Sequence, residues 1–514
     1  MVQLVEVSSR LGLIAGALSL FVIVYTAGCW IYNLWLHPLR KYPGPWFCAA
    51  SRIPYLRSLL SGRHHATVLH LHKKYGSIVR IAPNELAFSD AEAWRDIMGH
   101  KNNAEEFPKY RTIYRPGRAA LTPPDIIYSG RDEHAALRRQ LSHGFSDKSM
   151  RGQESRIVHF VDLLIKRLHQ WNDNGKTPLR MDSWYNFTTF DIIGDLAFGD
   201  SFDCLENSDY HEWVKCIFEL TRLGAYFQVE DYYPLLKRIV TRILPNRALE
   251  KQRFHDKINK AKLQKRIEAG SRDDLIDGVL KKKDEWNMSI EQLESNSTLL
   301  VIAGSETTAT VLSGVTYLLT SNPHTLKRLT EEVRSTFADE DEITIESASR
   351  LRYMLACLDE ALRMYPPVAV ALPRTTPKEG GMVAGTFLPK GTVVGVHHWA
   401  VYHMEEHFQD PFNFHPERFL GDARFANDNR NIFQPFHVGP RNCIGRNLAY
   451  AEMRLILARV IYNFDMKLAS ESSGWLSQRS YMLWEKNPLM VYLTPRADKE
   501  KLAVWREAAA STGA

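Results

Sequence analysis

The alternation of apolar and polar residues predicts a mostly α-helical protein with small β-sheets. The longest apolar run, residues 11–36, carries no charged side chain and is long enough to cross a bilayer as a helix. Helical periodicity covers much of residues 152–268 and returns over residues 290–321, where Ser289 and Gln292 have the spacing of a capping box. Shorter strand-like runs occur at residues 77–82, 380–396 and 489–493.

The N-terminal run predicts a single-pass membrane anchor. It ends in the bulky residues Trp30 and Trp35, which suit a membrane interface, whereas a cleaved signal peptide would have a shorter apolar region and a small-residue cleavage site. Arg40 and Lys41 follow the run, so we expect the bulk of the chain on the cytoplasmic face. Three glycosylation sequons would then stay unmodified: Asn186, Asn287 and Asn296.

Prolines and a glycine follow the apolar run and predict a stiff, extended connector. We therefore expect an anchor over residues 1–37, a proline-rich hinge over residues 38–50, and one large domain over residues 51–514. No internal repeat or long Gly/Ser linker divides the last of these.

Composition narrows the class of protein. The net charge of +6 is small for 514 residues and no Lys/Arg block has the form of a nucleic-acid-binding arm, so we expect no nucleic-acid partner. The six cysteines are scattered without a C-x-x-C pair, which argues against a disulfide framework or a structural zinc site and fits a reducing compartment. Four histidines between residues 64 and 72 lack metal-ligand spacing, and we expect them on a solvated helix surface.

The stretch from Phe436 to Gly445 places a cysteine at the start of a helix. Gly439 and Pro440 predict a turn, and Gly445 opens an Ala-rich helical run. Unpaired N–H groups at a helix N-terminus favour a thiolate, so Cys443 is a candidate soft-metal ligand. Taken alone, Cys443 would better suit a buried, small apolar position, which is the usual place of a free cysteine.

A second unusual feature lies in the middle of the helix predicted at residues 290–321. Gly304 costs about 1 kcal/mol relative to alanine there, so it needs a reason, and room for a small molecule is one. Thr307 lies on the same face, and Glu306 could bring protons inward. A Gly/Thr kink in a core helix is the alternative.

Together these motifs resemble the cytochrome P-450 family. The spacing F-x-x-G-x-R-x-C-x-G is that of the family's haem-ligand loop, and A-G-S-E-T-T resembles its oxygen-activation segment. Glu360 and Arg363 match the family's E-x-x-R pair, which Arg418 of Pro-Glu-Arg-Phe joins in a structural role. The resemblance implies the cytochrome P-450 fold, a helical haem domain with small sheets, behind a single N-terminal transmembrane helix.

The resemblance also implies residue roles around haem b. Cys443 would be the axial ligand of the iron, with Phe436 covering the sulfur and Gly445 allowing close approach of the macrocycle. Gly304, Glu306 and Thr307 would serve O2 activation and proton delivery. Candidate partners of the propionates are Arg138, Arg374, Arg441 and His134, the last standing where the family often has tryptophan.

The implied function is that of a haem-thiolate monooxygenase of the endoplasmic reticulum membrane. Electrons would come from NADPH through cytochrome P-450 reductase, for which Arg139, Arg441 and Arg446 suggest a basic docking face. The runs 42–45 and 190–199 resemble fungal members similar to the isotrichodermin C-15 hydroxylase group, which implies hydroxylation or epoxidation of an apolar terpenoid or polyketide intermediate. A haem-thiolate isomerase or dehydratase working without O2, and a non-enzymatic haem sensor, are the rival hypotheses.

Overall fold

A computed structural model describes residues 2–101, 105–114, 125–233, 246–272, 274–283, 285 and 288–496. The chain forms two compact units. The first contains residues 1–110 and 372–397, and the second contains residues 111–371 and 398–514.

The first unit is built on a four-stranded sheet of order β1-β2-β7-β4 and a β5–β6 hairpin. Its strands are β1 (Ile78–Ala82), β2 (Glu85–Phe88), β4 (Arg374–Thr375), β5 (Gly381–Val383), β6 (Thr386–Leu388) and β7 (Val393–Val396). Its helices are α1 (Val2–Ile31), α2 (Trp46–Ala50), α3 (Ile53–Leu60), α4 (His64–Tyr75) and α5 (Ala91–Met98), with a π-helical turn at Tyr32–Leu36 and a 3-10 turn at Pro38–Lys41. The strands predicted at residues 77–82 and 380–396 are confirmed.

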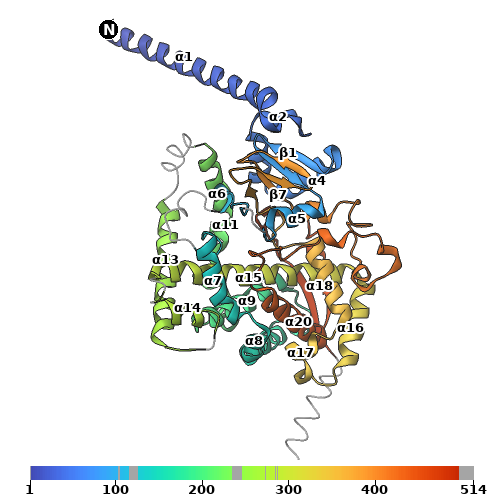
Figure 1. The fold of residues 1–514 in the computed structure, drawn as a ribbon. Coiled ribbons are helices and arrows are strands. Elements are labelled where there is room, and N and C mark those ends of the chain that lie inside the picture. The colour runs from blue at the N-terminus through green and yellow to red at the C-terminus, as the bar shows by residue number, and fades with distance from the viewer. Residues whose placement is uncertain are drawn as a thin grey trace, which may run out of the picture. The chain divides into compact units, whose positions relative to one another are not determined.

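Helix α1 is the predicted apolar N-terminal helix (Figure 1). The stretch Gly12–Leu36 has a mean hydropathy of 2.0, and none of its most apolar window is buried. An unburied apolar helix of this length has the dimensions of a membrane span, by length and composition.

The histidines of α4 correct one expectation. His64, His65 and His72 are buried inside the first unit, not displayed on a solvated surface. The Nδ1 atom of His64 lies 2.7 Å from Ser58 Oγ, and its ring stacks edge-on with His397. Within the described residues no group of three or more His, Cys, Asp or Glu side chains could hold a metal ion.

The second unit is mainly helical. Its longer helices are α7 (Arg131–Gly144), α8 (Asp147–Trp171), α9 (Met181–Phe198), α11 (Glu212–Tyr232), α13 (Asn246–Glu268), α15 (Ile290–Ser321), α16 (Pro323–Thr336), α18 (Arg352–Met364) and α20 (Arg446–Asn463). Shorter helices are α6 (Arg111–Tyr114), α10 (Cys204–Asn207), α14 (Asp277–Lys282), α17 (Ile345–Ala348) and α19 (His398–Tyr402). Short 3-10 turns lie at Asp173–Gly175, Glu340–Glu342, Pro416–Leu420, Ala423–Phe425, Arg430–Ile432 and Ser470–Ser472.

Two small sheets complete the second unit. Strand β11 (Met490–Pro495) lies between β3 (Leu179–Arg180) and β8 (Phe464–Leu468), and β9 (Arg479–Tyr481) forms a hairpin with β10 (Leu483–Glu485). The strand predicted at residues 489–493 is therefore confirmed, as is the mostly helical fold class with small sheets.

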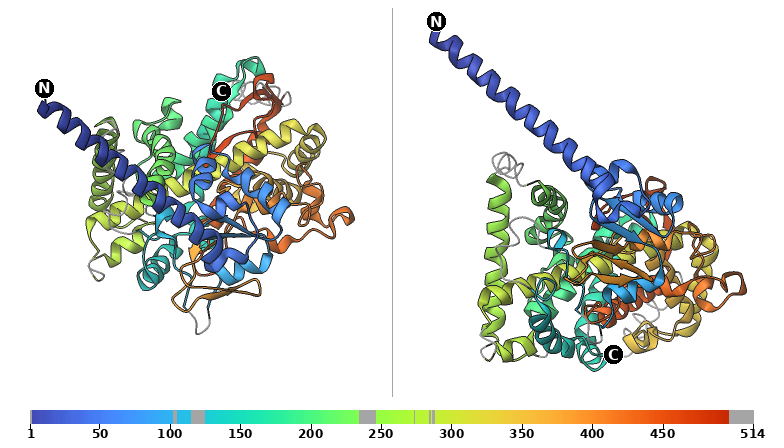
Figure 2. Two further views of the ribbon diagram at one scale, coloured as in Figure 1. Left: turned by 90° about the horizontal axis from the view of Figure 1, so that it is seen from above. Right: turned by 45° about the horizontal axis from the view of Figure 1, so that its top comes forward.

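Helix α15 runs through the interior of the second unit, with helices packed around it (Figures 1 and 2). Its predicted capping box is present, because the Ser289 hydroxyl accepts the N–H of Gln292 and the Gln292 side chain accepts the N–H of Ser289. Asn322 and Pro323 end the helix. α9 and α20 both contact α15, so this helix joins the two sides of the core.

Candidate active site

The cysteine loop is a tight turn followed by α20. The N–H of Cys443 donates to the carbonyl of Phe436 at 2.8 Å, and the N–H of Asn442 donates to that of Gly439 at 3.2 Å. Gly439 has φ +79°, a left-handed conformation that glycine adopts without strain. The turn brings Cys443 to the start of α20, where Gly445 is the N-cap residue.

Helix α7 braces this loop. The two terminal nitrogens of the Arg138 guanidinium donate to the backbone carbonyl and the side-chain oxygen of Asn442, each at 2.5 Å. The Asn447 amide donates to the carbonyl of Phe145, just after α7, at 3.4 Å. Arg138 therefore fixes Asn442, the residue next to Cys443. This role does not depend on whether Arg138 also binds a propionate.

The Cys443 side chain is exposed, although the residues beside it in the loop are half-buried. Surrounding protein nevertheless desolvates the thiol and raises its pKa, while the N–H of Gly445 and the charges of Arg138 and Arg446 act in the opposite direction. The expectation that N–H groups at the helix N-terminus favour the thiolate agrees with the direction in which the N–H of Gly445 acts, but desolvation is the larger effect on this pKa. A bound metal ion would supply the missing stabilisation, since a coordinating thiol loses its proton.

Helix α15 presents an uncovered stripe in the middle of the core. Ala303 is exposed and its neighbours on one face are half-buried, although the residues from 308 to 316 are all buried. These neighbours are Leu299, Ile302 and Thr307. The Thr307 hydroxyl donates to the carbonyl of Ala303 at 2.6 Å, so its oxygen lies on this stripe.

Gly304 has a different environment from the one its sequence suggested. A Cβ atom added there would lie 2.9 Å from Cδ1 of Ile193 on α9. The glycine thus permits close packing of α15 on α9, and its role in giving room to oxygen stays a prediction. Glu306 is buried, with its carboxylate directed to Lys486 near the C-terminal end.

These features fit a large flat ligand held by the thiol. Gly445 has a negative φ, and an added Cβ would meet only Phe145, at an ordinary 3.7 Å, so the polypeptide itself does not require glycine there. Cys443 and Ala303 are uncovered by protein although they belong to otherwise well-packed elements. A haem group matches this donor chemistry, because cysteine thiolate is a haem ligand suited to O–O cleavage.

The predicted E-x-x-R cluster is confirmed. Arg363 binds both oxygens of Glu360 at 2.8 Å, and Arg418 lies 3.0 Å from the same carboxylate. All three side chains are at most 1% exposed. Arg363 also donates to the carbonyls of Tyr402 and Pro411 at 2.8 Å, so the cluster ties α18 to the segment that leads into the cysteine loop.

The other predicted ligand-binding residues are placed as follows. His134 is buried on α7, one turn before Arg138, and Arg441 donates to the carbonyl of Ser129 at 3.2 Å. Phe436 is half-buried, with its ring centroid 5.3 Å from that of Tyr450. Arg374 belongs to the first unit, where it is buried on β4 and its Nε lies 3.3 Å from the sulfur of Met98.

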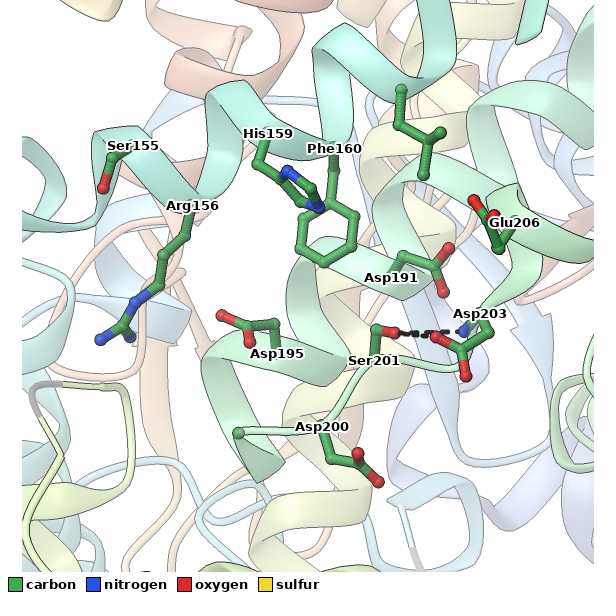
Figure 3. A pocket seen from close by; sticks show the side chains of 12 residues that line it. Ser155, Arg156, His159, Phe160, Asp191, Asp195, Asp200, Ser201, Asp203 and Glu206 are labelled. Carbon is green, nitrogen blue, oxygen red and sulfur yellow. Dashed lines mark hydrogen bonds between the residues drawn. The ribbon is translucent and has the colours of Figure 1, made fainter.

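A surface hollow of about 550 Å³ lies apart from these residues, between α8, α9 and the loop after α9 (Figure 3). Its carboxylates already have protein partners. Asp191 accepts three backbone N–H groups of residues 202–205, Asp195 pairs with Arg272, and Asp200 pairs with Lys262 and Lys265. We assign this hollow no part in the chemistry of Cys443.

Sequence reasoning missed two residues of this region. Asn442 stands inside the recognised motif, but its partnership with α7 crosses 304 positions. Lys486 follows β10 and reaches Glu306 across 180 positions. No local pattern signals either contact, because both depend on how distant elements pack.

Comparisons with known proteins agree with this geometry. The family model described as Cytochrome P-450 matches residues 42–493. The chain therefore belongs to the cytochrome P-450 family.

Among its relatives are fungal enzymes. It is 49% identical over 472 residues to cytochrome P-450 monooxygenase tpeC of Talaromyces stipitatus, covering 90% of this chain and 92% of that one. It is 44% identical to cytochrome P-450 monooxygenase prhB of Penicillium brasilianum, covering 94% and 98%. It is 43% identical to the trichothecene C-15 hydroxylase of Fusarium sporotrichioides, covering 91% and 95%. The protein is a cytochrome P-450 monooxygenase, an oxidoreductase whose family binds haem iron through a cysteine thiolate.

Proposed function

We propose that this enzyme is anchored in the endoplasmic reticulum membrane and hydroxylates or epoxidises an apolar intermediate of fungal secondary metabolism. NADPH–cytochrome P-450 reductase would supply the electrons. The observation that carries the proposal is the exposed Cys443 thiol, held at the start of α20 in a loop that α7 braces.

The haem-binding roles follow from the position of each side chain. Cys443 would ligate the iron of haem b, with Phe436 beside the loop and Gly439 setting its turn. When bound, the haem supplies a redox-active iron at which O2 is reduced and one oxygen atom is transferred. His134, Arg138, Arg374 and Arg441 remain our candidates for the propionates, with Arg138 also holding Asn442.

The chain's own contribution to turnover is proton handling and orientation. Thr307 presents a hydroxyl on the uncovered stripe of α15, and the preceding residue, Glu306, has a buried side chain. A buried carboxyl beside a hydroxyl can pass protons while bulk water is excluded. Leu299, Ile302 and Ala303 offer an apolar wall to a substrate.

The substrate class rests on the relatives. The Fusarium relative is named as a hydroxylase of a trichothecene at carbon 15, and several other relatives are named only as monooxygenases. We extend to this chain only the broad class of apolar terpenoid or polyketide intermediates. A panel of such compounds should include members that shift the haem absorption band, whereas hydrophilic isosteres should leave it unchanged.

The carbon monoxide difference spectrum of the reduced, detergent-solubilised protein tests the central assignment. We expect a red-shifted Soret band in the wild type that Cys443→Ala abolishes. Cys48→Ala, which alters a buried cysteine of the first unit, is the matched control and should keep the band. A folded wild type that binds no haem, or a band that survives in Cys443→Ala, would overturn the proposal.

Reductase docking has its own test. Arg139 and Arg446 are exposed, whereas Arg441 is half-buried and bound to Ser129, so only the first two can meet an acidic partner directly. Reversing both charges should slow NADPH-driven haem reduction several-fold at low salt, because opposite surface charge steers association. Lys467→Glu on the exposed face of β8 should have little effect, and unchanged reduction in the double variant would rule out the patch.

Membrane topology needs a test other than glycan mapping. Asn186 and Asn296 are buried in the second unit, so their lack of glycans would not report which side of the membrane they face, and Asn287 lies outside the described residues. Protease protection of microsomes reads the topology directly. The domain should be digested without detergent, and removal of residues 1–36 should shift the protein toward the soluble fraction.

A further inference from the structure

The segment after β10 carries one lysine into the core of the second unit. The ammonium group of Lys486 donates to Oε1 of Glu306 and, at 2.9 Å, to the hydroxyl of Thr310. The side chains of Lys486 and Glu306 are 5% and 3% exposed. The pair is therefore buried, and it joins the C-terminal strand region to the middle of α15.

The backbone on both sides of Lys486 is fixed. Trp484 stacks on Tyr365 at the end of α18 and donates its indole N–H to the carbonyl of Pro366 at 2.7 Å. The N–H of Leu489 donates to Asp182 in the first turn of α9 at 2.8 Å. The backbone position from which the Lys486 side chain reaches Glu306 is thus fixed by contacts on both sides.

The two oxygens of the Glu306 carboxylate have different surroundings. Oε1 accepts from Lys486 and lies 3.4 Å from the Thr310 hydroxyl. Oε2 is buried and has no hydrogen-bond partner within the part of the chain that the structure describes. A carboxylate oxygen that no protein group binds keeps its lone pairs available to accept a proton.

Charges around the carboxyl act in both directions. Burial raises the pKa of Glu306 and Asp182 adds to this effect, while the charge and hydrogen bond of Lys486 oppose it. Tyr210 and Tyr365 also lie within its electrostatic reach, and α20 places Glu452 next to Thr308. Lys486 is the cation among these groups.

We propose that Lys486 is a positioning residue for proton delivery, holding Glu306 through Oε1 so that Oε2 is the atom that takes up and releases each proton. Protons enter from solvent, bind Oε2 and leave toward Thr307, and the carboxyl returns to its starting state. This inference rests on the proposed monooxygenase function and adds a residue from a different part of the chain to it. A purely structural cross-link is the alternative, and it would leave the titration of Glu306 uncoupled from turnover.

The experiment uses the haem-loaded, full-length protein and the substitutions Lys486→Met, Lys486→Arg and Glu306→Gln. Infrared difference spectroscopy follows the carboxyl band that Glu306→Gln removes. Loss of a cation in contact with a carboxylate should raise the pH at which this band is half-formed by about 1–3 units. Lys486→Arg should keep it near the wild-type value, and Lys467→Met is the matched surface control.

The same variants then report on function through O2 consumption driven by NADPH and reductase. The rate of O2 consumption as a function of pH should have one limb that Glu306→Gln removes. In Lys486→Met, we expect the midpoint of this limb to shift by the same number of pH units as the infrared band. A band that does not move, or a limb that stays in place while the band moves, would overturn the inference.

A second variant covers the case in which Lys486→Met fails to bind haem. Thr310→Val removes one hydrogen bond from Lys486 while keeping both charges, and it should shift the band in the same direction by a smaller amount. An unchanged band there would count against the inference. Failure of the proposed function is distinguishable, because the wild type itself would then lack the carbon monoxide signature.

Discussion

At the scale of single residues, a desolvated charge is stable only when its partners are complete. Glu360 receives Arg363, Arg418 and the N–H of His415 at 3.1 Å, so its buried carboxylate is fully satisfied. Loss of one member leaves the others charged in a medium that cannot solvate them. The Cys443 thiol shows the opposite case, since desolvation by the surrounding protein raises its pKa although Gly445, Arg138 and Arg446 act against this effect.

We predict that Glu360→Gln lowers the free energy of unfolding by about 3–5 kcal/mol and reduces haem content. Urea titration of the purified protein measures the first effect and the haem-to-protein ratio the second. Glu346→Gln, at an exposed ion pair with Arg350, should change stability by less than about 1 kcal/mol. Equal effects of the two substitutions would show that burial of the cluster contributes nothing.

At the scale of elements, α15 packs closely on its neighbours wherever it carries glycine. A Cβ at Gly314 would lie 2.7 Å from Cδ1 of Tyr365. That ring cannot move aside, because it stacks on Trp484 and its hydroxyl donates to Gln478 at 2.6 Å. Gly304 repeats this relation with Ile193 of α9, so both glycines set the distance between helices.

We predict that Gly314→Ala destabilises the protein even though alanine is the better helix former. Overpacking costs about 1–3 kcal/mol, and the gain in helix propensity offsets no more than about 1 kcal/mol. Thermal unfolding followed by circular dichroism measures the difference. Gly224→Ala on α11, where an added Cβ meets nothing within 4 Å, is the matched control and should be neutral or stabilising.

At the scale of the whole molecule, both units bury neutral histidines. Burial lowers the pKa of His64 in the first unit to about 3 and that of His398 in the second unit to about 4. In the unfolded chain the imidazole rings of these two histidines bind protons below about pH 6.5. In the folded chain they do so only below the lower pKa values given above. The stability that these two neutral histidines contribute is therefore fully present above pH 6.5 and is lost as pH falls toward their folded-state pKa values.

We predict that His398 alone accounts for a loss of about 2 kcal/mol in the free energy of unfolding between pH 7 and pH 5. In His398→Gln, the free energy of unfolding should fall by about 2 kcal/mol less between pH 7 and pH 5 than it does in the wild type. This holds whatever the effect of the substitution on stability at pH 7. His70→Gln on the exposed side of α4 is the control. An unchanged pH difference in His398→Gln would contradict the prediction.

The sequence by itself determined the parts that are local. The turn at Gly439, the capping box of α15 and the E-x-x-R pair of α18 are all encoded within a few residues, because backbone conformation and helix periodicity act over that range. The apolar run of α1 and the haem-ligand spacing around Cys443 belong to the same kind of signal. These features sufficed to predict the family and its fold class.

Tertiary structure alone decided the contacts between distant segments. It paired Glu306 with Lys486, gave Gly304 a packing role against Ile193, and buried His64 in a helix whose pattern suggested solvent. Each outcome depends on which elements meet in space, and residues far apart in sequence carry no shared local pattern. The chemistry of the cysteine loop can thus be predicted from the sequence. The distant groups that contact the site residues, such as Lys486, are brought to them only by folding.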